Sequence, residues 1–171
     1  ISDLLAQKSY ETAAKYVREL SQAQTSRILI VNTHHPIIDA ILNQKYQMAV
    51  ESQIEMRFCI NDLSGIQLSA SELVVLLSNL LDNAIEACRR IDTERLIRCT
   101  ILENDGFFLS IRNTSLPVLI TEHGIATTKA SASEHGYGLP SVCRILDGLH
   151  AEYAYNYENG WFQFTAEIPK K

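Results

Sequence analysis

The stretch that decides the fold of this chain is residues 69–90, SASELVVLLSNLLDNAIEACRR. Ser69 can cap a helix, and Glu72 can reach back to complete a capping box. Apolar residues occupy most of the circumference of a helix that we expect to run to about Ile91, so most of its surface must be buried. Its polar residues share one stripe: Glu72, Asn79, Asp82, Asn83, Glu86 and Arg90.

Asn79 and Asn83 lie at positions i and i+4, which places their carboxamides side by side on this helix. Burying an amide without a partner costs on the order of 1–3 kcal/mol, so both need hydrogen-bonding partners, a ligand or solvent. One interpretation places the two amides in a ligand site. The other places them at the solvent-exposed edge of the helix, where they mark the boundary between core and surface. The amides alone favour neither.

The remaining elements follow from hydrophobic periodicity. Expected helices cover residues 2–24, 36–49, 70–91 and 139–149. Expected strands cover residues 54–60 and form two hairpins, 96–102 with 107–113 and 151–157 with 161–168. The helix 2–24 packs either on its own domain or on a helix of another chain. The pattern predicts an α+β fold, a two-layer sandwich of a mixed, mostly antiparallel sheet with about three helices on one face and the other face open.

Length and composition restrict the class of protein. The chain has 171 residues, 46% apolar and 20% charged, with a formal net charge of −5. This length predicts one domain with ample material for a core. The longest apolar run, Leu73 to Leu77, falls far short of the roughly twenty residues of a membrane span. The acidic balance argues against a dedicated nucleic-acid binder.

The chain shows no pattern typical of a metal site or a disulfide framework. Its cysteines, Cys59, Cys88, Cys99 and Cys143, are widely spaced and include no CxxC pair. We expect them to be buried, reduced thiols of a cytosolic protein. His34 and His35 are adjacent residues in a loop, which seldom bind one ion together, so we expect them to be exposed to solvent.

A second candidate site lies where the last expected helix begins. His135-Gly136-Tyr137-Gly138-Leu139-Pro140 places two glycines before this helix, where free N–H groups and the helix dipole favour an anion such as phosphate. Residues 114–136 lack a sustained period, and a structureless stretch of this length is more often functional than accidental. Within it, Thr127-Thr128-Lys129 supplies hydroxyls and a cation. Arg144 is a further candidate cation, and the Asn83 oxygen is a suitable ligand for Mg²⁺.

These segments together resemble a known superfamily. Residues 79–87, NLLDNAIEA, resemble the N box of the GHKL superfamily, which includes gyrase, MutL and histidine kinases, and residues 135–139, HGYGL, resemble its second glycine box. Residues 127–129 are similar to the ATP-lid segment of one branch, the sensor histidine kinases that resemble accessory-gene-regulator quorum-sensing receptors and citrate sensors. Residues 32–49 resemble the segment that precedes the nucleotide domain there.

The resemblance implies the Bergerat ATP-binding fold, with ATP and Mg²⁺ as cofactors and a lid at about residues 114–136. It implies that Asn83 coordinates Mg²⁺ and that Asn79 lines the phosphate end of the pocket. The implied ATP-binding residues are Asn79, Asn83, Asn113, Thr128, Lys129, Gly136, Tyr137, Gly138 and Leu139, of which Asn79, Asn83 and Lys129 are the implied catalytic set.

Two positions depart from the family pattern. The first glycine box, an Asp-x-Gly-x-Gly whose Asp contacts the adenine amino group, is replaced by Arg112-Asn113-Thr114-Ser115, so Asn113 becomes the candidate for the adenine contact. Glu86 stands where many kinases of other branches have Lys or Arg, so no phosphate contact is expected there. Hydrolases of the superfamily carry a Glu where this chain has Asn79. An amide cannot act as a general base, which favours phosphoryl transfer to a protein over rapid hydrolysis.

The expected nucleophile, a His on the first of two dimerisation helices, is not found in this chain. His34 and His35 precede a helix, His123 and His135 flank the lid, and His150 follows a helix. Residues 1–26 resemble the remnant of the second dimerisation helix, 27–35 a linker, and 36–171 the catalytic domain. We therefore expect the acceptor His to lie upstream, and a chain that binds ATP without phosphorylating itself.

The resemblance implies the cytoplasmic end of a membrane receptor, which forms a homodimer through its dimerisation helices and acts on a cognate response regulator, with no nucleic-acid partner. Two alternatives stay open. One is a nucleotide-binding or pseudokinase signalling module without catalysis, to which the degenerate first glycine box points. The other is a GHKL kinase that phosphorylates Ser on a partner protein, which the dimerisation-type helix counts against.

Overall fold

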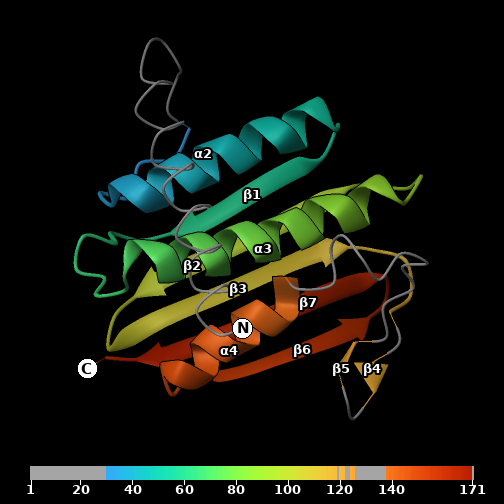
Figure 1. The fold of residues 1–171 in the computed structure, drawn as a ribbon. Helices are drawn as coiled ribbons and strands as arrows, with labels where there is room; N and C mark the ends of the chain where they lie inside the picture. The colour runs from blue at the N-terminus through green and yellow to red at the C-terminus, as the bar shows by residue number, and fades with distance from the viewer. Residues whose placement is uncertain (1–29, 119, 122–123, 126–137, 171) are drawn as a thin grey trace, which may run out of the picture.

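The fold is a two-layer α+β sandwich, seen in a computed structural model that describes residues 30–118, 120–121, 124–125 and 138–170. Its sheet has the strand order β1-β2-β3-β7-β6. The strands are β1 (Glu55–Ile60), β2 (Leu96–Glu103), β3 (Gly106–Thr114), β6 (Glu152–Glu158) and β7 (Trp161–Pro169). β1 pairs with β2 in parallel and the other neighbours pair antiparallel. The described helices cover one face and leave the other uncovered (Figure 1), which confirms the predicted architecture.

The three helices in the described part of the chain are α2 (Pro36–Glu51), α3 (Ala70–Arg89) and α4 (Gly138–Gly148). α2 begins at a proline, and the His35 side chain caps it by accepting a hydrogen bond from the Ile38 amide. α3 begins with the predicted capping box, in which Ser69 Oγ accepts from the Glu72 amide and the Glu72 carboxylate accepts from the Ser69 amide. None of the described helices is long and apolar enough to cross a membrane.

The core lies between the helices and the sheet. α3 supplies the largest set of buried side chains, among them Leu73, Leu76, Leu77, Leu81 and Ile85. The helix-facing row of β3 consists of Phe107, Leu109 and Ile111, all buried, and the buried Asn113 continues this row at the end of the strand. The row of buried apolar side chains on β3 therefore ends in a polar residue at one end of the sheet.

The structure corrects three sequence expectations. The stretch 114–136 was expected to lack regular structure, but β4 (Ile120–Thr121) and β5 (Gly124–Ile125) pair as a short two-stranded sheet within it. Cys59 was expected to be buried, but it points out of edge strand β1 and is exposed, because the two-residue repeat of a strand turns it away from the core. His35 was expected to be exposed, but it is partly buried, because its side chain caps the first turn of α2. The predicted helix 2–24 lies outside the described residues.

Candidate functional site

The N-box residue Asn79 meets the second glycine box in space. Asn79 lies in the middle of α3, half-buried, and its Nδ2 donates to the Val75 carbonyl one turn earlier at 2.7 Å. Gly138 is the first residue of α4, and a Cβ atom built on it would lie 3.1 Å from Asn79 Oδ1. Any larger residue would crowd this oxygen. The glycine thus lets the start of α4 approach the amide closely, and the structure brings together two segments that the sequence singled out separately.

Asn83 lies one turn further along α3 and is exposed. Its side chain makes no hydrogen bond with any residue that the structure describes. This amide oxygen is therefore available to an external ligand, and it is a hard donor of the kind that Mg²⁺ accepts while keeping several waters. The described residues contain no group of three or more His, Cys, Asp or Glu that could hold a metal ion on its own.

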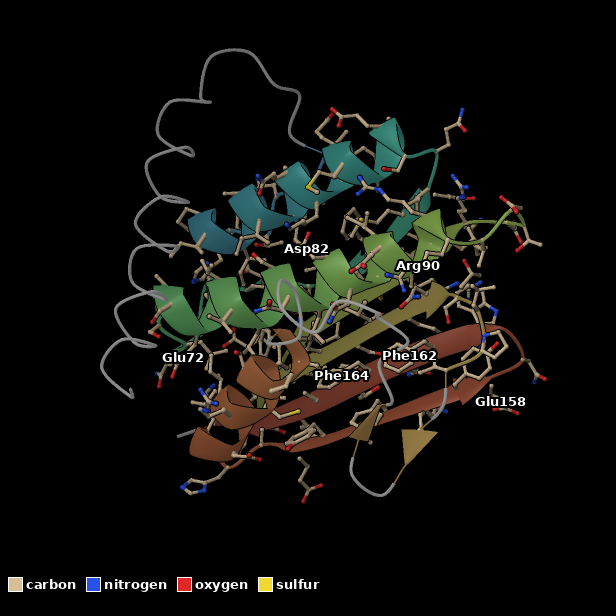
Figure 2. All side chains as sticks on the ribbon, turned by 45° about the vertical axis from the view of Figure 1, so that its right-hand side comes forward. Glu72, Asp82, Arg90, Glu158, Phe162 and Phe164 are labelled. Carbon is tan, nitrogen blue, oxygen red and sulfur yellow. The ribbon has the colours of Figure 1, made fainter. Side chains whose placement is uncertain are left out.

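The polar stripe of α3 is divided between different partners. Asp82 turns toward α2 (Figure 2) and accepts a hydrogen bond from Lys45 Nζ at 2.8 Å. The Lys45 side chain is 5% exposed and that of Asp82 is 50% exposed. Glu86 pairs with Arg90 at 2.6 Å, and Glu72 belongs to the capping box. The acidic members of the stripe are thus engaged with protein groups, whereas the Asn79 oxygen lies beside the start of α4.

Asn113 is 2% exposed and occupies the end of β3 on the helix side. Its Nδ2 donates to the Thr114 carbonyl at 3.0 Å. The Cys88 thiol of α3 reaches the same Thr114 carbonyl at 3.4 Å, which places this end of β3 against the C-terminal part of α3. Burial raises the pKa of the Cys88 thiol, which keeps it in the neutral, donating form. Asn113 therefore lies below the same helix that carries Asn83.

Phe162 was missed by the sequence reasoning. It pairs with Asn113 across β3 and β7 and packs against the core while partly exposed. Figure 2 shows Phe162 and Phe164 on the helix-facing side of β7. The centroid of the Tyr155 ring lies 6.5 Å from that of Phe162, and the two ring planes are inclined by 29°. The alternation of Phe162 and Phe164 along the strand was the available signal, because it placed both rings on one face.

The other candidate residues are distributed as follows. Leu139 is half-buried and packs against the core at the start of α4, and Arg144 is exposed on the same helix. Thr127, Thr128, Lys129, Gly136 and Tyr137 lie outside the described residues.

His34 is exposed, as predicted, and its Nδ1 lies 2.7 Å from the Asp62 carboxylate. Hydrogen bonds from Ser64, and then from His34, lower the pKa of Asp62 to about 2.

A cavity of about 50 Å³ lies at the opposite end of the sheet. Its lining includes Phe107 at the start of β3, Ile168 near the end of β7 and Leu149 after α4. Phe107 and Asn113 stand at the two ends of the same strand. The cavity is therefore separate from the cluster of Asn79, Asn83 and Gly138.

Comparison with solved structures shows a shared fold. The catalytic domain of histidine kinase ThkA, in a nucleotide-free form, is 22% identical over 81% of this chain and 93% of that chain, with a TM-score of 0.60. The histidine kinase domain of a blue-light activated histidine kinase from Erythrobacter litoralis is 12% identical over 94% of this chain and 74% of that chain, with a TM-score of 0.61. Histidine kinase AdeS from Acinetobacter baumannii is 16% identical over 98% of this chain and 82% of that chain, with a TM-score of 0.56.

No curated protein sequence matches the chain. A protein-family model described as a GHKL domain matches residues 68–169, which is more than half of the chain and includes α3, β3, α4 and β7. This match includes both the N box and the second glycine box. The chain therefore belongs to the GHKL domain family.

Proposed function

We propose that this chain is the ATP-binding catalytic part of a sensor histidine kinase, which transfers the γ-phosphoryl group of ATP to a His on a dimerisation helix. Membership of the GHKL family implies nucleotide binding, and the shared fold is that of histidine kinase catalytic domains. In this proposal the acceptor His lies outside the chain. The chain forms the cytoplasmic end of a membrane receptor that dimerises and passes the phosphoryl group to a response regulator.

The observation that carries the proposal is the close approach of Gly138 to Asn79. Because Gly138 has no side chain, the start of α4, where the first N–H groups of a helix have no partner within it, lies beside an amide of α3. Free N–H groups at a helix start attract phosphate oxygens, and the dipole of α4 adds to this attraction. The residues present therefore fit a nucleotide whose phosphates lie between the start of α4 and the middle of α3.

Two further residues fit the ends of such a nucleotide. Asn83 is exposed and makes no side-chain hydrogen bond within the described residues, so its oxygen suits a Mg²⁺ ion that also binds phosphate oxygens and water. Asn113 is a buried amide beside the partly exposed ring of Phe162. The amide can hydrogen-bond the adenine edge while the ring contacts the base. Thr128, Lys129, Gly136 and Tyr137 are assigned to the lid and glycine box by resemblance.

Asn79 supports transfer over hydrolysis. Its Nδ2 is held by the Val75 carbonyl, so its oxygen turns toward Gly138 as a hydrogen-bond acceptor. An amide has no basic group that could take a proton from water. The site therefore orients a nucleotide without supplying the base that hydrolysis needs, and Mg²⁺, when bound, neutralises phosphate charge.

Nucleotide binding can be tested by calorimetric titration of the chain with ATP in the presence of Mg²⁺. We expect Asn83→Ala to weaken binding about tenfold or more, as the loss of a bond to a charged group does. In EDTA the wild type and Asn83→Ala should bind equally, because Asn83 acts through the metal. Asn104→Ala, an amide loss in the β2–β3 turn, serves as the matched control. Equal Mg²⁺-dependent binding by wild type and Asn83→Ala would contradict the assignment.

Phosphoryl transfer needs a separate test with γ-labelled ATP. We expect no label on any His of this chain alone, and label on a His of the full-length receptor. Label on a Ser of a partner protein would instead support a GHKL Ser kinase. ATP binding without transfer in the full-length receptor would support a nucleotide-binding module without catalysis.

A further inference from the structure

The open face of the sheet carries a row of arginines. Arg57 of β1 is paired directly with Arg98 of β2, and Arg98 with Arg112 of β3. Side chains at directly paired positions stand close together, and like charges there are destabilising. All three lie on the face away from the helices, since their strand neighbours Met56, Ile97, Ile111 and Asn113 are buried on the other side. The fold thus concentrates positive charge on a chain whose net charge is −5.

Among the described residues, the first arginine of the row is the one with a carboxylate partner. Arg57 Nε donates to the Glu55 carboxylate at 2.6 Å. Arg98 and Arg112 make no ion pair with any described residue. Instead both guanidinium groups lie over the ring of Trp161, the first residue of β7, at 5.2 Å and 4.5 Å from its centroid. Stacking on a ring holds a guanidinium in place while its N–H groups stay available in the plane.

The surface beside the cluster is polar and ordered. Gln163 is paired with Arg112 on the next strand. Its Nε2 donates to Ser110 Oγ at 3.2 Å and to Thr165 Oγ1 at 3.2 Å. These bonds fix the neighbouring side chains, so a ligand of the arginines would meet a prearranged surface. Arginine and tryptophan are also the residue types that contribute most to protein interfaces.

The positive charge of Arg98 and Arg112 indicates which kind of ligand this surface would bind. A planar guanidinium presents parallel N–H groups that match a carboxylate in a bidentate pair. A nucleic acid is disfavoured because the rest of the acidic chain repels its phosphate backbone. On the same face, Glu152 of β6 is paired with Glu167 of β7, and Glu158 of β6 is paired with Trp161, so β6 repels carboxylates. An acidic segment would therefore lie along the half formed by β2 and β3.

We propose that Arg98, Arg112 and Trp161 on the open face of the sheet form a docking site for a carboxylate-rich segment of a partner protein. This surface is on the opposite side of the sheet from Asn79, Asn83 and Asn113. The site is therefore independent of the proposed nucleotide chemistry, and a partner bound there leaves the helix-covered side accessible.

The single tryptophan of the chain gives a direct test. Trp161 emission is followed while the chain is titrated with an oligoglutamate peptide. We expect a saturable change that weakens as salt is added. Arg98→Gln and Arg112→Gln should each lower the affinity about fivefold, the upper range for one exposed ion pair. Arg89→Gln, which removes the same charge from the helix layer, should leave the affinity unchanged.

Several results would overturn the proposal. These are an absent or non-saturable response to oligoglutamate, a response equally weakened by Arg89→Gln, and tighter binding of a DNA duplex or inorganic phosphate at the same salt concentration. A Trp161 emission that shifts with protein concentration alone, together with a dimer in sedimentation, would assign the face to a second copy of the chain. Thermal unfolding followed by circular dichroism establishes that each variant is folded before it is titrated.

Discussion

Arg112 and Asn113 are neighbours in β3, yet they lie on opposite faces of the sheet and in different surroundings. Asn113 is 2% exposed and continues the buried row of Phe107, Leu109 and Ile111 beneath α3. Arg112 lies over Trp161 on the face that the described helices leave uncovered. Because side chains alternate across a strand, neighbouring residues of β3 place a buried amide on one face of the sheet and a guanidinium on the other. Changes on either face should therefore have effects that do not spread to the other.

The largest contrast in stability is expected on β7, between Phe164 and its neighbour Gln163. Phe164 is 1% exposed in the core, so Phe164→Ala should lower the free energy of unfolding by about 3–5 kcal/mol through lost burial and a residual cavity. Gln163→Ala removes only surface hydrogen bonds, and it should lower this free energy by less than about 1 kcal/mol. Urea denaturation measures both. Similar losses for the two variants would contradict the division of the sheet into a packed and an open face.

Charge should be tolerated differently on the two sides. In the helix layer, Asp82→Asn removes the carboxylate that pairs with the buried Lys45, so we expect a loss of about 1–2 kcal/mol, moderated because Asp82 is half exposed. On the open face, Arg98→Gln relieves repulsion from the paired Arg112 but loses the contact with Trp161, so the two effects offset and the free energy of unfolding should change by less than about 0.5 kcal/mol. Denaturation at low salt measures both. A loss for Arg98→Gln as large as the loss for Asp82→Asn would contradict the charge arrangement described.

The helix-covered face could be predicted largely from the sequence. Helix and strand positions followed from periodicity, and the Ser69 capping box was predicted from local residues and confirmed. Each of these depends on neighbours in the chain or on burial against a single core, which apolar patterns encode directly.

The open face could not be predicted in the same way. Arg57, Arg98 and Arg112 come from three strands, and they form a row only because β1 joins β2 in parallel at one particular register. Register depends on the packing of the whole sheet rather than on the residues of one strand. The pairing of Lys45 with Asp82 depends likewise on how α2 and α3 pack, so their spacing in the sequence gave no indication of it.

The functional contrast between neighbours is tested by Asn113→Ala and Arg112→Gln. We expect Asn113→Ala to weaken ATP binding about tenfold, because it removes a buried amide from the proposed adenine end, and to leave the oligoglutamate affinity unchanged. Arg112→Gln should do the reverse. Calorimetry with ATP and Trp161 emission with the peptide measure the two affinities on each variant. A variant that alters both would show that the faces are coupled.

The smallest perturbation uses two cysteines on the neighbouring strands β1 and β2. Cys59 is exposed on the open face, whereas Cys99 is 1% exposed on the helix side, where burial raises its pKa to about 12. At pH 8 the Cys99 thiolate amounts to about one part in ten thousand, and a reagent cannot reach it in the folded chain. We therefore expect iodoacetamide at pH 8 to alkylate Cys59 and to leave Cys99 unmodified, as read by peptide mass spectrometry.

Raising the pH to 9 should leave Cys99 unmodified as well, because its thiolate stays rare and buried. Urea above the unfolding midpoint should expose both, and modification of Cys99 before unfolding would place it on the wrong face of the sheet.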